Sequence, residues 1–417
     1  MKLRLTLFLI LISCAYPESG QHWVATWTTP QPLMRSQPVA RPGADAAAPQ
    51  GPALTPQAIN ARGFHDQTVR MIVHISIGGS RLRVKLANPF GGVPVSVGNA
   101  HIAIRGKDSE IVPASDHALA FNGKPGCTIG PGVVILSDPV DLTVAAQADL
   151  AVSLYLPGET GPPASHNGLH TSYVSSKPGN LTDAPSMAES IPVPGYFWLA
   201  GIDVLAPARA ALIVTLGDSI TEGARSTPDT DRMWPAVLSA RLAANKNTAN
   251  FGVANMGIGG NRVLRDGAGA SALARFDRDV LSQSGVKWVM LLEGINDIGR
   301  GNTEPVSADE LIGAFKQMIE RAHTHGIRVV GCTLTPYEGA GYAQEEGEAI
   351  REALNNWIRT GGAFDAVVDF EAATRDPNSP KRIRADFDPG DHLHPNDAGY
   401  KAMGEAIDLS IFTRKQP

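Results

Sequence analysis

The sequence has 417 residues, of which 43% are hydrophobic and 18% are charged. This composition is typical of a soluble globular chain that is long enough for two domains. The formal net charge of -5 implies no basic surface, which argues against nucleic acid as a partner.

The first twenty residues are typical of an export signal. Lys2 and Arg4 precede the apolar run 5–12, which is too short to span a bilayer. We therefore expect a signal peptide over residues 1–20 and a secreted protein, extracellular or periplasmic. The segment that ends at Cys14 also resembles a lipoprotein signal, in which this cysteine carries a lipid anchor. Ordinary cleavage a few residues later is the alternative. No other stretch is long and apolar enough for a transmembrane helix.

Residues 21–205, called the β half here, show the pattern of a β-rich domain. Residues 68–77 and 81–86 alternate apolar and polar side chains around Gly78-Gly79, which predicts a β-hairpin. Residues 30–56 are rich in proline and alanine and predict a surface loop. Further strands are expected at 21–28, 93–97, 100–104, 132–136 and 150–156. Short strands separated by glycine and proline favour a β-sandwich or jelly-roll domain.

The pattern changes over residues 206–417, called the α/β half here. Segments 211–216 and 286–292 are continuous apolar runs, as strands covered on both faces are. Further strands are expected at 327–334 and 364–370, and helices at 234–242, 308–325, 346–359 and 396–407. Asn396 is the predicted N-cap of the last helix. Strands that alternate with helices predict an α/β domain with a parallel sheet.

Ser219 comes shortly after the apolar strand 211–216, at its carboxyl end. In α/β sheets, ligands bind at the carboxyl ends of the strands. A serine hydroxyl needs a base to accept its proton, and the base needs an orienting acid. Asp391 and His394 are three residues apart, so one turn of backbone presents both side chains to one point. His392 is a competing base, although it adjoins Asp391 too closely for an easy contact. The alternative for Ser219 is a plain turn or helix cap.

Acyl transfer also needs hydrogen-bond donors for an oxyanion, and two further segments offer them. Residues 255–261 form a glycine-rich turn, whose backbone N–H groups are accessible. Asn296 follows the strand 286–292 and carries a side-chain amide. The alternatives are a phosphate cradle or tight loop for the first segment and a turn or cap for Asn296.

Taken in chain order, these four segments resemble the four signature blocks of the SGNH hydrolase (GDSL esterase/lipase) superfamily. The resemblance implies a three-layer, flavodoxin-like α/β fold with a five-stranded parallel sheet, and a reaction that needs no metal or cofactor. It implies a triad of Ser219, Asp391 and His394, with an oxyanion hole made by Ser219, Gly260 (or Gly259, one register earlier) and Asn296. The whole chain resembles a bacterial secreted subgroup with an N-terminal β-rich domain.

We therefore expect a serine esterase that acts through an acyl-enzyme on a small-molecule or polysaccharide ester, with acetyl esters on carbohydrate favoured. A lipase, lysophospholipase or arylesterase on the same triad is one alternative. A carbohydrate-binding protein with an inert hydrolase-like half is another. Asn261, Arg262, Arg265 and Asp266 are candidates for contacts with sugar hydroxyls, or else ordinary loop residues. Aromatic residues of the β half are candidates for stacking on sugars, or else for core packing: Phe121, Tyr155, Tyr173, Tyr196, Phe197 and Trp198. Cys127 and Cys332 lack zinc-site spacing, and Cys332 is expected to be a buried free thiol.

Overall fold

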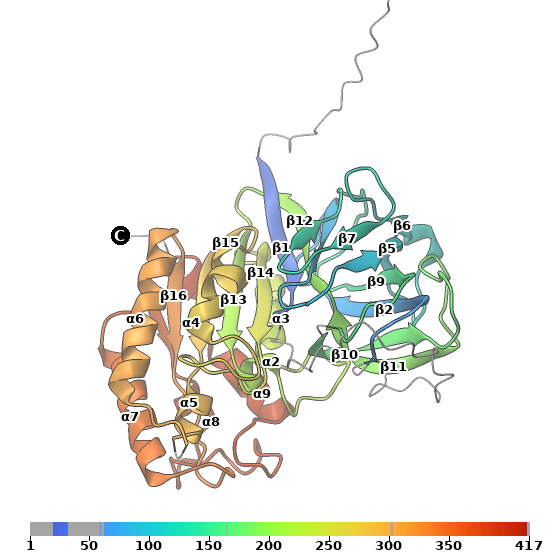
Figure 1. Cartoon of the computed structure of the whole chain (residues 1–417). Coiled ribbons are helices and arrows are strands. Elements are labelled where there is room, and N and C mark those ends of the chain that lie inside the picture. The colour runs from blue at the N-terminus through green and yellow to red at the C-terminus, as the bar shows by residue number, and fades with distance from the viewer. Residues whose placement is uncertain (1–19, 32–58, 60–61, 164, 302, 415–417) are drawn as a thin grey trace, which may run out of the picture.

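The computed structural model describes residues 20–31, 59, 62–163, 165–301 and 303–414 (Figure 1). The predicted signal peptide, Cys14 and most of the predicted loop 30–56 lie outside the described residues. Within those ranges, no helix has the length and apolarity needed to cross a bilayer.

The β half consists of antiparallel sheets, as predicted. The larger sheet has six strands in the order β11-β10-β2-β9-β5-β6. Their bounds are β2 (Gln67–His74), β5 (Asn99–Ile104), β6 (His117–Ala118), β9 (Asp149–Leu156), β10 (Ser165–Ser175) and β11 (Ser190–Phe197).

A second sheet has four strands in the order β1-β12-β3-β8. Their bounds are β1 (Gln21–Thr28), β3 (Leu82–Ala87), β8 (Val134–Leu136) and β12 (Leu199–Pro207). Strands β4 (Val95–Val97) and β7 (Cys127–Ile129) pair separately, and a 3₁₀ turn, η1, covers Pro113–Ser115. The alternation predicted for β3 is real, since Leu82, Val84 and Leu86 are all buried.

The predicted hairpin around Gly78-Gly79 is wrong. Strand β2 lies between β9 and β10 in the six-stranded sheet, whereas β3 lies between β12 and β8 in the other. The two glycines instead allow residues 144–146 to approach. The Gly79 N–H donates to Val144 O at 3.1 Å, and a Cβ on Gly78 would lie 2.4 Å from the same oxygen. The glycine pair therefore marks a crossing between sheets and not a two-residue turn.

The α/β half contains the predicted five-stranded parallel sheet, in the order β14-β13-β15-β16-β17. The strands are β13 (Ala211–Gly217), β14 (Phe251–Gly257), β15 (Val286–Leu292), β16 (Arg328–Cys332) and β17 (Ala366–Val368). The helices are α2 (Ser219–Glu222), α3 (Trp234–Ala244), α4 (Ala272–Phe276), α5 (Ile295–Gly299), α6 (Ala308–Thr324), α7 (Glu345–Thr360), α8 (Phe370–Thr374) and α9 (Asp397–Ala406). Two short turns, η2 (Asp277–Leu281) and η3 (Leu409–Phe412), complete the set.

The helices form two packed groups beside this sheet, one of α3, α8 and α9 and the other of α4, α5, α6 and α7. Strand β13 is buried along its whole length, which explains its unbroken apolar sequence. Asn396 caps α9, as predicted, by accepting from the N–H groups of Ala398 and Gly399.

The two halves share one continuous hydrophobic core. Strand β1 packs against β14, and the Ala25 N–H donates to Ser284 O at 2.9 Å. The Gln147 side chain donates to Ser239 Oγ across the same boundary. The β half is therefore fastened to the α/β half, and Figure 1 shows β1 running between them.

Candidate active site

Ser219 lies at the carboxyl end of β13, at the start of the one-turn helix α2. Asp218 caps this helix by accepting from the Ile220 N–H at 2.9 Å. Gly217 ends the strand, and a Cβ there would lie 2.5 Å from Leu292 O. Only glycine allows the chain to turn this close to β15, and the turn places the Ser219 hydroxyl beyond the sheet.

The structure brings Ser219, His394 and Asp391 into one hydrogen-bonded chain, although Ser219 and His394 are 175 positions apart. The Ser219 hydroxyl lies 2.9 Å from His394 Nε2, and His394 Nδ1 lies 2.9 Å from Asp391 Oδ2. The other oxygen, Asp391 Oδ1, accepts from the backbone N–H groups of Leu393 and His394. One turn of the loop therefore aligns both side chains.

His392, the competing base, does not contact Ser219. Its side chain is 51% exposed, and Nδ1 lies 2.5 Å from Asp388 Oδ2. The residue has a positive φ of 60°. The loop therefore carries two His–Asp pairs, of which only one reaches the serine.

Arg225 is a contributor that the sequence did not reveal. Its Nε donates to Asp391 Oδ2 at 2.9 Å across 166 positions. Burial by itself would raise the pKa of Asp391. Hydrogen bonds from His394, Leu393 and Arg225 outweigh it and hold this pKa well below its usual range. Asp391 is therefore a carboxylate at neutral pH, able to orient His394 and to stabilise its charged form.

The candidate oxyanion donors lie on two neighbouring loops. The Gly259 N–H bonds the Glu222 carboxylate, whereas the Gly260 N–H has no acceptor among the described residues. Gly260 has a φ of 74°. This arrangement favours Gly260 over Gly259 as a free donor. Asn296 Nδ2 donates one bond to Asn261 O at 3.0 Å, which leaves its second N–H available.

Arg275, on α4, connects the turn that carries Ser219 with the strand that leads to the glycine loop. Its fully buried guanidinium donates to the carbonyl oxygens of Gly217 at 2.9 Å and Met256 at 2.7 Å. It also bonds Asn261 Oδ1 and pairs with Asp279. One side chain thus holds the turn before Ser219 and the strand before the glycine loop in a fixed relation.

Three carboxyl groups lie on the segments around Ser219: Asp218 and Glu293 are buried, and the Glu222 side chain is 15% exposed. Burial is the main cause that raises the pKa of Asp218 to about 7 and that of Glu222 to about 8. Burial also raises the pKa of Glu293 well above its usual value. Neither Glu293 oxygen has a hydrogen-bond partner in the described part of the chain. Its Oε2 lies 3.8 Å from Arg275 Nη2, within ion-pair distance but beyond hydrogen-bond distance.

Most of the aromatic residues singled out in the β half are packing residues. Phe121, Tyr196, Phe197 and Trp198 are buried. The Tyr155 hydroxyl donates to Asp66 Oδ1 at 2.6 Å. Tyr173 is half-buried. Cys332 is buried and free, as predicted, and Cys127 is also free.

A parallel α/β sheet with a serine, a histidine and an aspartate in hydrogen-bonded sequence at its carboxyl edge defines the α/β serine hydrolases as a class. The sequence profile of the GDSL-like Lipase/Acylhydrolase family matches residues 215–402. This part of the chain belongs to that family and is a carboxylic ester hydrolase domain. The resemblance drawn from the four sequence segments is thereby confirmed.

The solved structures that the chain is similar to cover about half of it. A structure described as a lipolytic protein of the G-D-S-L family from Desulfitobacterium hafniense has 24% identity and a TM-score of 0.37, over 47% of this chain and 97% of its own. A GDSL-like lipase from Bacteroides thetaiotaomicron has 22% identity and a TM-score of 0.37, over 48% and 88%. A catalytic mutant of an acetylxylan esterase from Geobacillus stearothermophilus has 22% identity and a TM-score of 0.37, over 47% and 91%. No curated protein sequence matches the chain.

Proposed function

We propose that this protein is a secreted serine esterase that forms an acyl-enzyme on Ser219 and removes short acyl groups, acetyl above all, from carbohydrate. The observation that carries the proposal is the unbroken chain from the Ser219 hydroxyl through His394 to Asp391, with 2.9 Å at each step. These distances lie within reach for proton transfer.

In the proposed reaction, the Ser219 oxygen attacks the ester carbonyl while its proton passes to His394 Nε2. Asp391 accepts from Nδ1, which fixes the tautomer in which Nε2 is free to take that proton. The imidazolium then gives the proton to the departing alcohol, and the acyl group stays on Ser219. Water repeats the sequence in the second half-reaction and releases the acid.

The negative charge that develops on the carbonyl oxygen needs fixed donors. The backbone N–H groups of Ser219 and Gly260 and the free N–H of Asn296 are proposed for this role. Arg275 supports the arrangement because it holds the carbonyl groups of Gly217 and Met256 in place. Donors that are already oriented need no reorganisation when the charge appears.

A short acyl group is supported by the distribution of the large hydrophobic side chains that are most exposed. In the described part of the chain these are Val93, Val112, Val133, Val134, Leu136 and Val367. None of them belongs to the loops that carry Ser219, Gly260, Asn296 or His394. The partly buried Leu393 adjoins His394, so the apolar surface beside the triad is small.

The polar residues after the glycine loop contribute less to substrate binding than their sequence suggested. Arg262 pairs with Glu304, and Asn261 is buried and bonds Ala270 O. Arg265 donates to backbone oxygens of residues 304 and 305. These side chains already have partners within the protein, so the alternative of ordinary loop residues is favoured for them.

A hydrolysis panel tests the proposal. The substrates are acetyl-xylan, acetylated pectin, and p-nitrophenyl esters of short and long acyl chains, with Ser219→Ala as the control. We expect kcat/KM to fall as the acyl chain lengthens and the burst of p-nitrophenol to vanish in Ser219→Ala. A rise with chain length would indicate a lipase or lysophospholipase. Binding of xylan without release of acetate from any substrate would indicate a carbohydrate-binding protein.

Export is proposed from Lys2, Arg4 and the apolar run that follows them. Expression of the full chain in a bacterium, followed by mass spectrometry of the mature N-terminus, tests it. Cleavage before Cys14 with an added lipid mass would identify a membrane-anchored lipoprotein. Cleavage a few residues later would identify a free secreted enzyme, and an intact Met1 would contradict export.

A further inference from the structure

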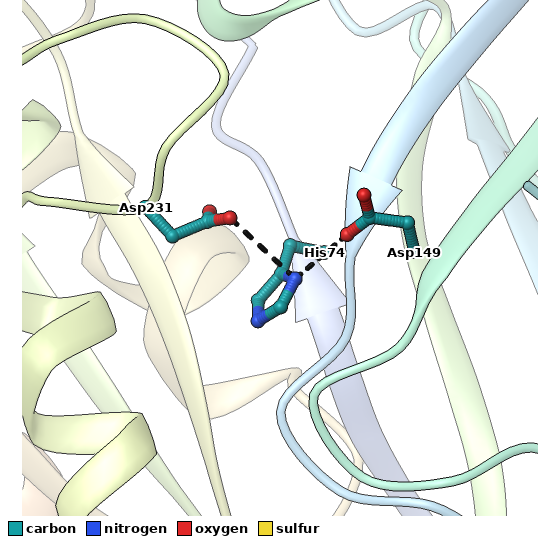
Figure 2. Close-up of side chains that lie close together, drawn as sticks. All are labelled: His74, Asp149 and Asp231. Atoms are coloured by element: carbon teal, nitrogen blue, oxygen red, sulfur yellow. Dashed lines mark hydrogen bonds and ion pairs between the residues drawn. The ribbon is translucent and has the colours of Figure 1, made fainter. Parts of the chain in front are cut away.

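Three metal-binding types of side chain meet where the β half contacts the α/β half (Figure 2). His74 ends β2, Asp149 begins β9, and Asp231 lies between α2 and α3. His74 Nδ1 lies 2.7 Å from Asp149 Oδ1 and 3.5 Å from Asp231 Oδ2. All three donor atoms lie within 4.8 Å of one another. Figure 2 shows both carboxylates directed at the same imidazole nitrogen.

The remaining atoms of these side chains are held by further residues. Asp149 Oδ2 accepts from Arg105 Nη1 at 3.0 Å, and Asp231 Oδ1 bonds His170 Nε2 at 2.9 Å. The His74 ring also bonds the Gln147 side chain. In metal sites of proteins, residues that do not touch the metal orient each ligand in this way, while the atom that coordinates the metal stays available.

Hydrogen bonding within the protein leaves the cluster incompletely satisfied. A single proton on His74 Nδ1 can be donated to only one carboxylate, and Asp149 is the nearer. Asp231 Oδ2 accepts no hydrogen bond from the described residues. The His170 side chain is only 4% exposed, yet its Nδ1 has no hydrogen-bond partner in the described part of the chain and lies 3.6 Å from Asp229 Oδ1. Converging carboxylates without enough donors favour a cation.

Space for a cation is present beside these residues. His74, His170 and Asp231 line a cavity of about 90 Å³, which Thr28 also lines with a buried hydroxyl that has no partner among the described residues. One water needs only about 10–15 Å³ on such a scale. The cavity therefore has room for water ligands on the open side of an ion.

We propose that His74, Asp149 and Asp231 bind a first-row divalent cation, with Zn²⁺ the best match to one imidazole and two carboxylates. Nitrogen and oxygen donors of this kind suit zinc, whose inner ligands here would be completed by water. The sequence does not predict such a site, because its residues include no cysteine and have no characteristic spacing. The site lies outside the triad of Ser219, His394 and Asp391. Two of its residues belong to the β half and one to the α/β half, so its role is to join the two halves.

The segment that such a cation would hold in place is connected to the triad through Arg225. Residues 223–233 carry both Asp231 and Arg225, and Arg225 bonds Asp391. Asp229 accepts from the N–H and hydroxyl of Thr171 on β10, each at 2.7 Å. Arg225, Asp229 and Asp231 have φ values of 72°, 58° and 53°, a conformation that costs free energy in non-glycine residues. A bound cation would stabilise this strained segment against the β half.

Zinc titration of the full chain tests the proposal. The protein is treated with EDTA, freed of chelator and titrated with ZnCl₂ by calorimetry, with thermal unfolding measured in parallel. The variants are Asp231→Asn and Asp149→Asn, which keep the side-chain shape. His101→Gln is the matched control, because His101 Nδ1 lies 2.8 Å from Asp116 Oδ2 but has no third potential ligand among the residues that the structure describes.

We expect about one Zn²⁺ per chain and a higher Tm with zinc in the wild type and in His101→Gln. Each aspartate variant should bind zinc at least about 10–100-fold more weakly, since even loss of an outer partner costs that much. Anomalous diffraction from zinc-soaked crystals should place the ion between the three side chains. Wild type that binds no zinc, or aspartate variants that bind it as tightly, would overturn the proposal and leave a set of ion pairs. Circular dichroism confirms that each variant is folded.

Discussion

Replacement of Asp391 by asparagine separates the two tasks of this carboxylate, because its oxygens have different partners. Oδ1 accepts from the backbone N–H groups of Leu393 and His394, and an asparagine oxygen can keep both bonds. Oδ2 accepts from His394 Nδ1 and Arg225 Nε. An NH₂ group in that place faces two donors, so His394 must turn to the tautomer with its proton on Nε2, which can no longer accept from Ser219.

We expect kcat for an aryl acetate to fall about 10⁴-fold, the effect of the same change in a Ser-His-Asp protease. This corresponds to about 5.5 kcal/mol of barrier. The assay is p-nitrophenyl acetate hydrolysis with burst analysis. Asp388→Asn is the matched control, since it alters the other His–Asp pair of this loop, and it should keep activity within about tenfold of the wild type. A folded Asp391→Asn variant as active as Asp388→Asn would refute the role given to Asp391.

Three further variants test the surroundings of the serine. Asn296→Ala should lower kcat about 10²–10³-fold through loss of one oxyanion donor, whereas Tyr342→Phe, which removes only a 3.4 Å contact to Asn296, should change it far less; steady-state kinetics compare the two. Arg275→Met should cost about 3–5 kcal/mol in urea unfolding, because it removes the buried hydrogen bonds to Gly217 O, Met256 O and Asn261 Oδ1; a loss below about 1 kcal/mol would contradict the tether. Glu222, whose pKa burial raises to about 8, binds a proton in the folded state that the unfolded chain has released. Its contribution to stability is therefore lost as pH rises from about 4.3 through about 8. Between about pH 6.5 and 8, the wild type should lose more unfolding free energy than Glu222→Gln; equal losses would contradict this assignment.

Local pattern was enough to predict the elements of the α/β half that carry their own periodicity. Strand β15 has the predicted bounds, and α6 differs from its prediction by one residue. Both depend on side chains within one segment. Strand β14 was not predicted, because Gly252, Ala254 and Asn255 interrupt its apolar pattern. Strand β14 pairs with β13 along its whole length, and this pairing stabilises it as a strand although its own sequence does not indicate one.

The sequence did not predict which distant strands pair with one another. The alternation in β2 and β3 identified both strands correctly, yet their partners are β9, β10, β12 and β8. The same limit applies to the site. Motifs predicted Ser219, Asp391, His394 and Asn296 as candidate site residues, whereas Arg225 and Arg275 make their contacts across 166 and 58 positions from segments without a motif.

Labelling with a fluorophosphonate tests the central claim most directly, because the reagent reacts with a serine activated by a neighbouring base. Peptide mapping of the full chain should locate the adduct on Ser219, and His394→Ala should abolish the labelling while the protein stays folded. An adduct on another residue, or ester hydrolysis that persists in Ser219→Ala with no labelling at position 219, would contradict the account.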